Sequence, residues 1–108
     1  TTDGDCLDIV ENNVPLAYTL SYNYPNPFNP TTTINYSVKN AGNVKIDIYN
    51  ILGQHVYILV NSYHVPGNMY QITWNSNSQS NIPIASGVYF YKMVSEDFEK
   101  EGRMTFLK

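Results

Sequence analysis

Apolar and polar residues alternate along much of the chain, which predicts β-strands rather than helices. Between residues 31 and 38, every second position belongs to one face: Thr32, Ile34, Tyr36 and Val38. Successive side chains of a strand point to opposite faces of a sheet, so a period of two is typical of a half-buried strand. This stretch therefore predicts a strand with one face on a core.

Six further strands are predicted from similar runs separated by turn residues. They are expected at residues 16–24, 44–49, 54–60, 69–74, 87–94 and 100–108. In the second of these, Val44, Ile46 and Ile48 face inward, and Lys45 and Asp47 face outward. The run GVYFYKMV is apolar on both faces, as in a central strand.

Turn chemistry predicts the connections between these strands. Gly53 is expected in a left-handed conformation within YNILGQHV, with Ile51 or Leu52 closing the end of the core. The acidic run EDFEKE is expected at a hairpin tip, where exposed charges are ordinary.

About seven short strands without a helix-period segment predict an all-β chain. We expect an immunoglobulin-like antiparallel β-sandwich, and a small closed barrel is the alternative. Residues 1–17 lack periodicity and predict a linker or the tail of a preceding module. Residues 18–108 are expected to form the domain.

Composition and charge narrow the function classes. The chain has 108 residues, a net charge of −3 and only six Lys and Arg residues, which are scattered. Nucleic-acid binding needs clustered basic residues, so it is not expected. No apolar run is long enough to span a membrane. The polar, acidic start is unlike a signal peptide, so we expect a cytosolic chain or a piece of a longer exported protein.

No catalytic, metal-binding or cofactor-binding pattern stands out. His55 is expected at a strand shoulder and His64 in a polar loop, and neither has a carboxylate or thiol at metal-ligand spacing. Cys6 is the single cysteine and is interpreted as a linker residue. The prediction is a non-enzymatic domain without metal or cofactor.

Aromatic residues are abundant, with ten tyrosines. Rows of Tyr beside Trp74 are compatible with a carbohydrate-binding module. However, Tyr36, Tyr70 and Trp74 fall on apolar faces, which favours a place in the core.

The most unusual segment packs three prolines into six residues: Pro25, Asn26, Pro27, Phe28, Asn29 and Pro30. Each proline ring fixes φ and restricts the preceding residue to extended geometry. We expect a stiff crossover that carries the chain from one sheet to the other, with Phe28 tucked into the end of the core.

Five motifs occur in order: NYPNPFNPTTTINYSV, VKIDIYNILGQHV, PGNMYQITWN, IASGVYFYKMV and a terminal RMTFLK. Together they resemble the type A C-terminal sorting domain of the type IX (Por) secretion system, over about four-fifths of the chain. Flagellar hook-capping immunoglobulin-like domains share part of the pattern. A non-sorting structural or interaction module is therefore an alternative, beside the carbohydrate-binding module.

The resemblance implies a non-catalytic address label fused to an upstream passenger protein. Its expected partners are the outer-membrane translocon and a sortase-like peptidase, with cleavage within residues 10–19. The protein is expected in the periplasm during transit, and then at the outer-membrane surface or outside the cell.

The resemblance also assigns residues. The structural motif comprises the proline-rich segment and Gly53. Recognition by the translocon is expected to involve Gly87, Tyr89, Arg103, Met104, Phe106 and Lys108. The family commonly has Lys where this chain has Arg103, and Arg presents a planar fork in place of a point charge. Independently of the family, a terminal strand at a sheet edge is a template for strand addition by a partner.

Overall fold

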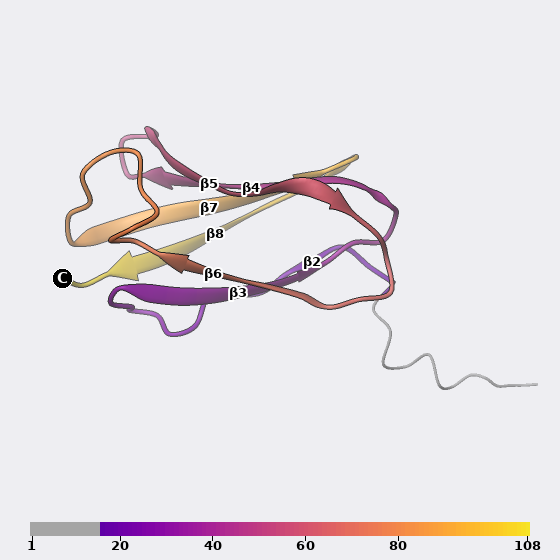
Figure 1. The fold of residues 1–108 in the computed structure, drawn as a ribbon, viewed down its shortest axis with the longest axis horizontal. Helices are drawn as coiled ribbons and strands as arrows, with labels where there is room; N and C mark the ends of the chain where they lie inside the picture. The colour runs from indigo at the N-terminus through magenta and orange to yellow at the C-terminus, as the bar shows by residue number, and fades with distance from the viewer. Residues whose placement is uncertain (1–15) are drawn as a thin grey trace, which may run out of the picture.

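The computed structural model describes residues 16–108, which form seven strands in two antiparallel sheets. The three-stranded sheet has the order β2 (Thr19–Leu20), β3 (Thr31–Ser37), β6 (Tyr70–Asn75). The four-stranded sheet has the order β5 (His55–His64), β4 (Gly42–Asn50), β7 (Gly87–Ser95), β8 (Phe98–Phe106). The two sheets lie face to face (Figure 1), which confirms the all-β, immunoglobulin-like sandwich.

The core lies between the sheets and is built from the alternation seen in the sequence. The predicted inward face of residues 31–38 is buried throughout. Val44, Ile46 and Ile48 of β4 are also fully buried. β7 lies between β4 and β8, which explains why its sequence is apolar on both faces. Tyr36 and Trp74 belong to the core, as predicted, and Tyr70 packs against it while partly exposed.

The strands run lengthwise between two ends of the sandwich (Figure 1). At the entry end, β2 begins beside the last residue of β3, since Thr19 pairs with Ser37. At the far end lie the β4–β5 turn, the long β6–β7 loop, the proline-rich segment and the end of β8 (Figure 1).

Two expectations about the first strands are wrong. The strand predicted at residues 16–24 is only Thr19–Leu20, followed by a single bridge between Tyr24 and Thr33. The proline-rich segment does not carry the chain to the other sheet, because β2 and β3 belong to the same sheet. Phe28 does enter the core, at 2% exposure.

Side chains at the β4–β5 turn and on β4 also depart from prediction. Gly53 is left-handed, with φ of 82°, as expected. Ile51 and Leu52 do not close the core, because they are 71% and 80% exposed. Asp47 lies on the outer face but is only 5% exposed, because the side chains of neighbouring strands surround it.

His64 lies at the end of β5 and is buried, not in a polar loop. Its Nδ1–H donates to the carbonyl of Ser62 at 2.9 Å, so Nε2 accepts the hydroxyl hydrogen of Tyr36 at 2.8 Å. Both ring nitrogens are satisfied, which makes His64 a structural residue. Burial raises the pKa of Tyr36 to about 12, with a smaller contribution from Tyr70.

Candidate functional site

The terminal strand β8 is an edge strand, paired with β7 on one side only. Backbone groups of consecutive strand residues point alternately to either side. Thr105 and Leu107 bond away from β7, because both form backbone hydrogen bonds with Phe28. By this alternation, the backbone groups of Glu99, Glu101 and Arg103 also point away from β7.

The proline-rich segment covers the last part of this edge. The N–H of Thr105 donates to the Asn26 side-chain oxygen at 3.0 Å, and the N–H of Phe28 donates to the Thr105 carbonyl at 2.9 Å. The N–H of Leu107 then donates to the Phe28 carbonyl at 3.0 Å. These three bonds form what we call the clasp. The proline-rich segment thus reaches the edge of the opposite sheet while connecting β2 to β3.

Ahead of the clasp the edge is open. Within residues 16–108, the outward backbone groups of Glu99, Glu101 and Arg103 have no hydrogen-bond partner. Of these three residues, Glu101 lines a hollow of about 290 Å³, which lies between Leu20–Tyr22 on one side and Lys100–Gly102 on the other. An open stretch of backbone beside a hollow is a place where a further strand can pair.

Tyr91 closes the floor of this hollow. Its ring lies over Gly102, where a methyl group would come within 2.1 Å of the ring. Its hydroxyl donates to the Ser21 carbonyl at 2.9 Å, which ties β7 to the chain after β2. Burial is the main cause that raises the pKa of Tyr91. The Tyr91 ring beside the open edge is therefore held in place at both Gly102 and Ser21.

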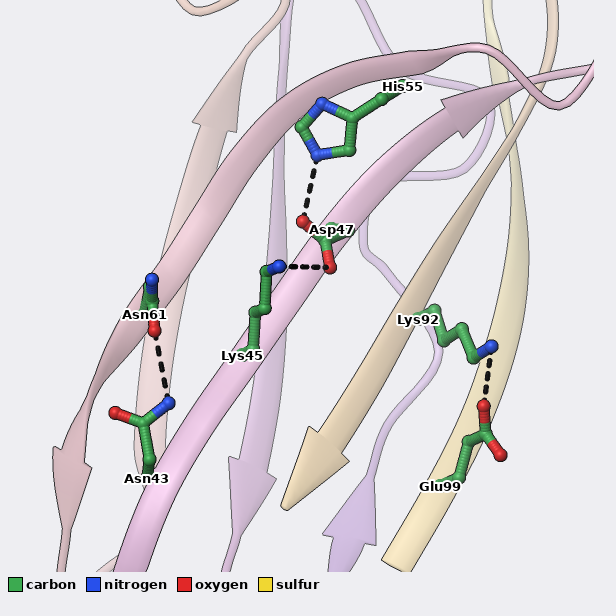
Figure 2. A network of polar contacts seen from close by, with 7 residues as sticks. All are labelled: Asn43, Lys45, Asp47, His55, Asn61, Lys92 and Glu99. Atoms are coloured by element: carbon green, nitrogen blue, oxygen red, sulfur yellow. Dashed lines mark hydrogen bonds and ion pairs between the residues drawn. The ribbon is translucent and has the colours of Figure 1, made fainter.

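Charged side chains cover the outer face of the four-stranded sheet, as Figure 2 shows. His55 Nε2 lies 2.8 Å from Asp47 Oδ1, and Lys45 Nζ lies 3.9 Å from Asp47 Oδ2. Lys92 forms an ion pair with Glu99, and this hydrogen bond raises the pKa of Lys92. The His55–Asp47 and Lys92–Glu99 pairs join neighbouring strands, and the Lys45–Asp47 pair lies within β4.

Glu101 and Arg103 differ from these paired charges. Both are exposed on β8, opposite Lys92 and Phe90 of β7. Neither forms an ion pair with any residue from 16 to 108. The open edge therefore carries one acidic and one basic side chain that are available to a partner.

Three residues expected in recognition lie in the core, and a fourth, Gly87, begins β7. Met104 and Phe106 are fully buried, and Tyr89 is 6% exposed with its hydroxyl bonded to the Ala85 carbonyl at 2.7 Å. Gly87 starts β7 with φ of 151°, a conformation that side chains disfavour. Their positions support the fold around the edge.

Arg103 and Lys108 are the two expected residues on the surface. Lys108 lies beyond the clasp, where its N–H donates to the Ser86 hydroxyl at 2.8 Å. Of the residues expected in recognition, the core thus contains Tyr89, Met104 and Phe106, and only the two cations are exposed. Only Arg103 lies on the open stretch.

Between residues 16 and 108, no group of three His, Cys, Asp or Glu side chains is placed to hold a metal ion. The same range contains no helix that is long and apolar enough to cross a membrane. The predicted tail, with Cys6, lies outside the described residues.

Sequence reasoning missed the clasp and with it the limits of the open edge. Asn26 is expected only as part of the proline-rich structural motif, yet its side-chain oxygen takes the place of a strand carbonyl for Thr105. Contacts between residues so far apart leave no local pattern. The only available signal was an Asn between prolines, a type of residue whose side chain often bonds to backbone.

Comparison with known protein families gave one match. The family described as "Secretion system C-terminal sorting domain" matches residues 23–104. No curated protein and no solved structure showed significant similarity to the chain. The matched range begins before the proline-rich segment and includes the open stretch of β8.

Proposed function

Given that this chain belongs to the family of secretion system C-terminal sorting domains, we propose that the open edge of β8 is where the type IX machinery recognises it. The domain is non-catalytic and directs the secretion of a passenger protein through the type IX system. It interacts with that machinery, and the protein that carries it is secreted or displayed at the cell surface.

The observation that carries the proposal is the open backbone from Glu99 to Arg103. An extended segment of a partner can add here as a further strand, with main-chain hydrogen bonds supplying affinity. Glu101 and Arg103 then supply specificity, because a partner strand must place opposite charges beside them. The clasp at Thr105 limits the length of the added strand.

The expected recognition residues take two roles in this proposal. Arg103 and Lys108 contact the translocon, with Arg103 beside the added strand. Tyr89, Met104 and Phe106 hold β7 and β8 in shape from inside the core, and Gly87 gives β7 its starting conformation.

We place the domain boundary at residue 18. Among residues 16–108, Tyr18 is the first whose side chain packs on the sandwich, where it stacks on Phe98 with ring centroids 4.9 Å apart. Residues 1–17 serve as the linker to the upstream passenger. Cleavage by a sortase-like peptidase within residues 10–19 removes the domain next to β2, after the protein has passed through the periplasm to the outer-membrane surface or beyond.

The test is a reporter protein fused upstream of the chain in a host with a type IX system. Glu101→Pro removes an outward N–H without removing a hydrogen bond to β7, because proline is tolerated at the free side of an edge strand. We expect secretion of the reporter to fall about tenfold, while the purified variant keeps its melting temperature within a few degrees.

Gln71→Pro is the matched control. Gln71 lies on β6, whose outer edge is also unpaired, and its side chain is exposed. This variant should be secreted like the parent. Normal secretion of Glu101→Pro would refute recognition through β8. Deleting Phe106 to Lys108 is a poorer test, because Phe106 is fully buried and its loss would unfold the domain.

A further inference from the structure

The β4–β5 turn is rigid and is held by one side chain. The Asn50 side-chain oxygen accepts the N–H of Leu52 at 3.0 Å and that of Gln54 at 2.9 Å. The Asn50 side-chain amide donates to Gln54 at 2.7 Å, and the backbones of these two residues also bond. Gly53 completes the turn with a left-handed φ and donates its N–H to the Asn50 carbonyl.

This rigid turn presents two large aliphatic side chains to solvent. Ile51 is 71% exposed and Leu52 is 80% exposed. They occupy the central turn positions, where small or polar residues are usual. They add nothing to the core, so the stability of the fold does not account for them. We call these two residues the apolar tip.

A hollow of about 390 Å³ leads from the tip across the outer face of the sheet. Its floor is the cross-strand pair of Tyr49 and Phe90, and its far side is formed by Lys92 and Glu101. Ile51 stands at one end and Glu101, on the open edge, at the other. The distance across β4, β7 and β8 is about 10 Å, which is two strand spacings.

We propose that the apolar tip is a second docking element, which inserts into an apolar pocket of the same type IX protein that pairs with β8. The inference rests on the proposed function, because it takes the open edge as the first contact. Because hydrogen bonds already fix the backbone of this turn, it loses little conformational entropy on binding, and such preorganisation raises affinity. When a strand of the partner pairs with β8, the neighbouring part of the partner lies over the hollow and extends toward the tip.

Charge favours a protein pocket over a lipid surface as the occupant. Residues 49–54 include no charged side chain, and the nearby cation of Lys92 is engaged by Glu99. Apolar segments that bind membrane surfaces usually have Lys and Arg beside them for anionic headgroups. Here the free charge along the hollow is that of Glu101, which calls for a basic group on the partner.

The test is the double substitution Ile51→Ser with Leu52→Ser in the fused reporter. We expect secretion to fall about tenfold, as for loss of an interface hot spot. The melting temperature of the purified chain should stay the same or rise, because both side chains are exposed. Secretion at the level of the parent would overturn the inference.

A matched control removes exposed apolar surface away from the tip. Tyr63 and Met69 are 70% and 58% exposed, next to the loop between β5 and β6. Replacement of both by Ser should leave secretion unchanged. An equal loss in this control would show that general surface hydrophobicity matters, and would also overturn the inference.

Two further comparisons separate the contacts. If Glu101→Pro blocks secretion and the tip variant does not, recognition by β8 stands and the tip inference falls. If only the tip variant blocks secretion, recognition by β8 falls. Sedimentation of the parent chain, but not the tip variant, with phosphatidylethanolamine–phosphatidylglycerol vesicles would identify a membrane as the occupant and overturn the protein pocket.

Discussion

The contact between Tyr91 and Gly102 shows how one residue can determine the shape of the candidate site. Glycine is required at residue 102 because the Tyr91 ring occupies the space of a side chain. This places the Tyr91 hydroxyl on the Ser21 carbonyl and leaves the backbone of β8 open beside the hollow. A glycine within a strand often marks such a close approach.

Gly102→Ala should therefore destabilise the domain by about 1–3 kcal/mol, as overpacked cores do. The added methyl group would displace the Tyr91 ring and break its bond to Ser21. Urea denaturation followed by the fluorescence of Trp74 measures the change.

Gly42→Ala is the control for this substitution. There the added methyl group meets only the side chain of Glu96, which is exposed and can move away. Equal stability losses in the two variants would contradict the role given to Tyr91.

At the scale of elements, alternation in the sequence was sufficient to predict most strands. The inward-facing residues of 31–38 and of β4 are buried as expected. The β4–β5 turn was predicted correctly in its glycine but not in its tip, because apolar residues are expected inside and Ile51 and Leu52 lie outside. Hydrophobicity alone does not distinguish a core residue from a docking residue.

The clasp is the element that sequence reasoning could not predict, and it changes what the proline-rich segment is expected to do. Phe28 and Asn26 bind the edge of β8 on the side away from β7, so the segment stabilises the four-stranded sheet without being one of its strands. The candidate site is defined by where this contact stops. Only its general location, at the terminal strand, could be predicted.

Pro25→Ala with Pro27→Ala should lower stability by about 1–2 kcal/mol in total, because each substitution makes the unfolded chain more flexible. At a permissive temperature, secretion of a fused reporter should stay close to that of the parent, although the melting temperature falls. Melting curves and reporter secretion, measured on the same variants, test this.

Asn26→Ala provides a comparison, since it removes the bond to Thr105 without changing a proline. It should also lower the melting temperature. Loss of secretion with unchanged stability, in either variant, would assign recognition to the proline-rich segment.

On the scale of the whole molecule, two buried tyrosines hold the sandwich together. Tyr36 bonds to His64, and Tyr91 bonds to Ser21. Burial raises both pKa values, that of Tyr36 to about 12. The folded state therefore keeps protons that the unfolded state loses above pH 10.

Titration of these tyrosines should therefore leave the free energy of unfolding unchanged below pH 10, and should decrease it as the pH rises from 10 toward 12. Urea denaturation at a series of pH values measures the decrease. Tyr36→Phe lowers stability at neutral pH, because His64 loses its partner, but it should also make the alkaline decrease shallower. An unchanged slope would show that Tyr36 does not contribute.

The placement of the two ends determines how the domain bears tension. A passenger pulls on the chain ahead of β2 at the entry end, while β8 points toward the far end (Figure 1). Force between the passenger and a partner holding β8 thus acts along the strands. The bonds between β2 and β3 are then loaded together in shear, and the clasp, which follows β2 along the chain, takes the load after them. This geometry favours a domain that stays folded while force acts between its passenger and its partner.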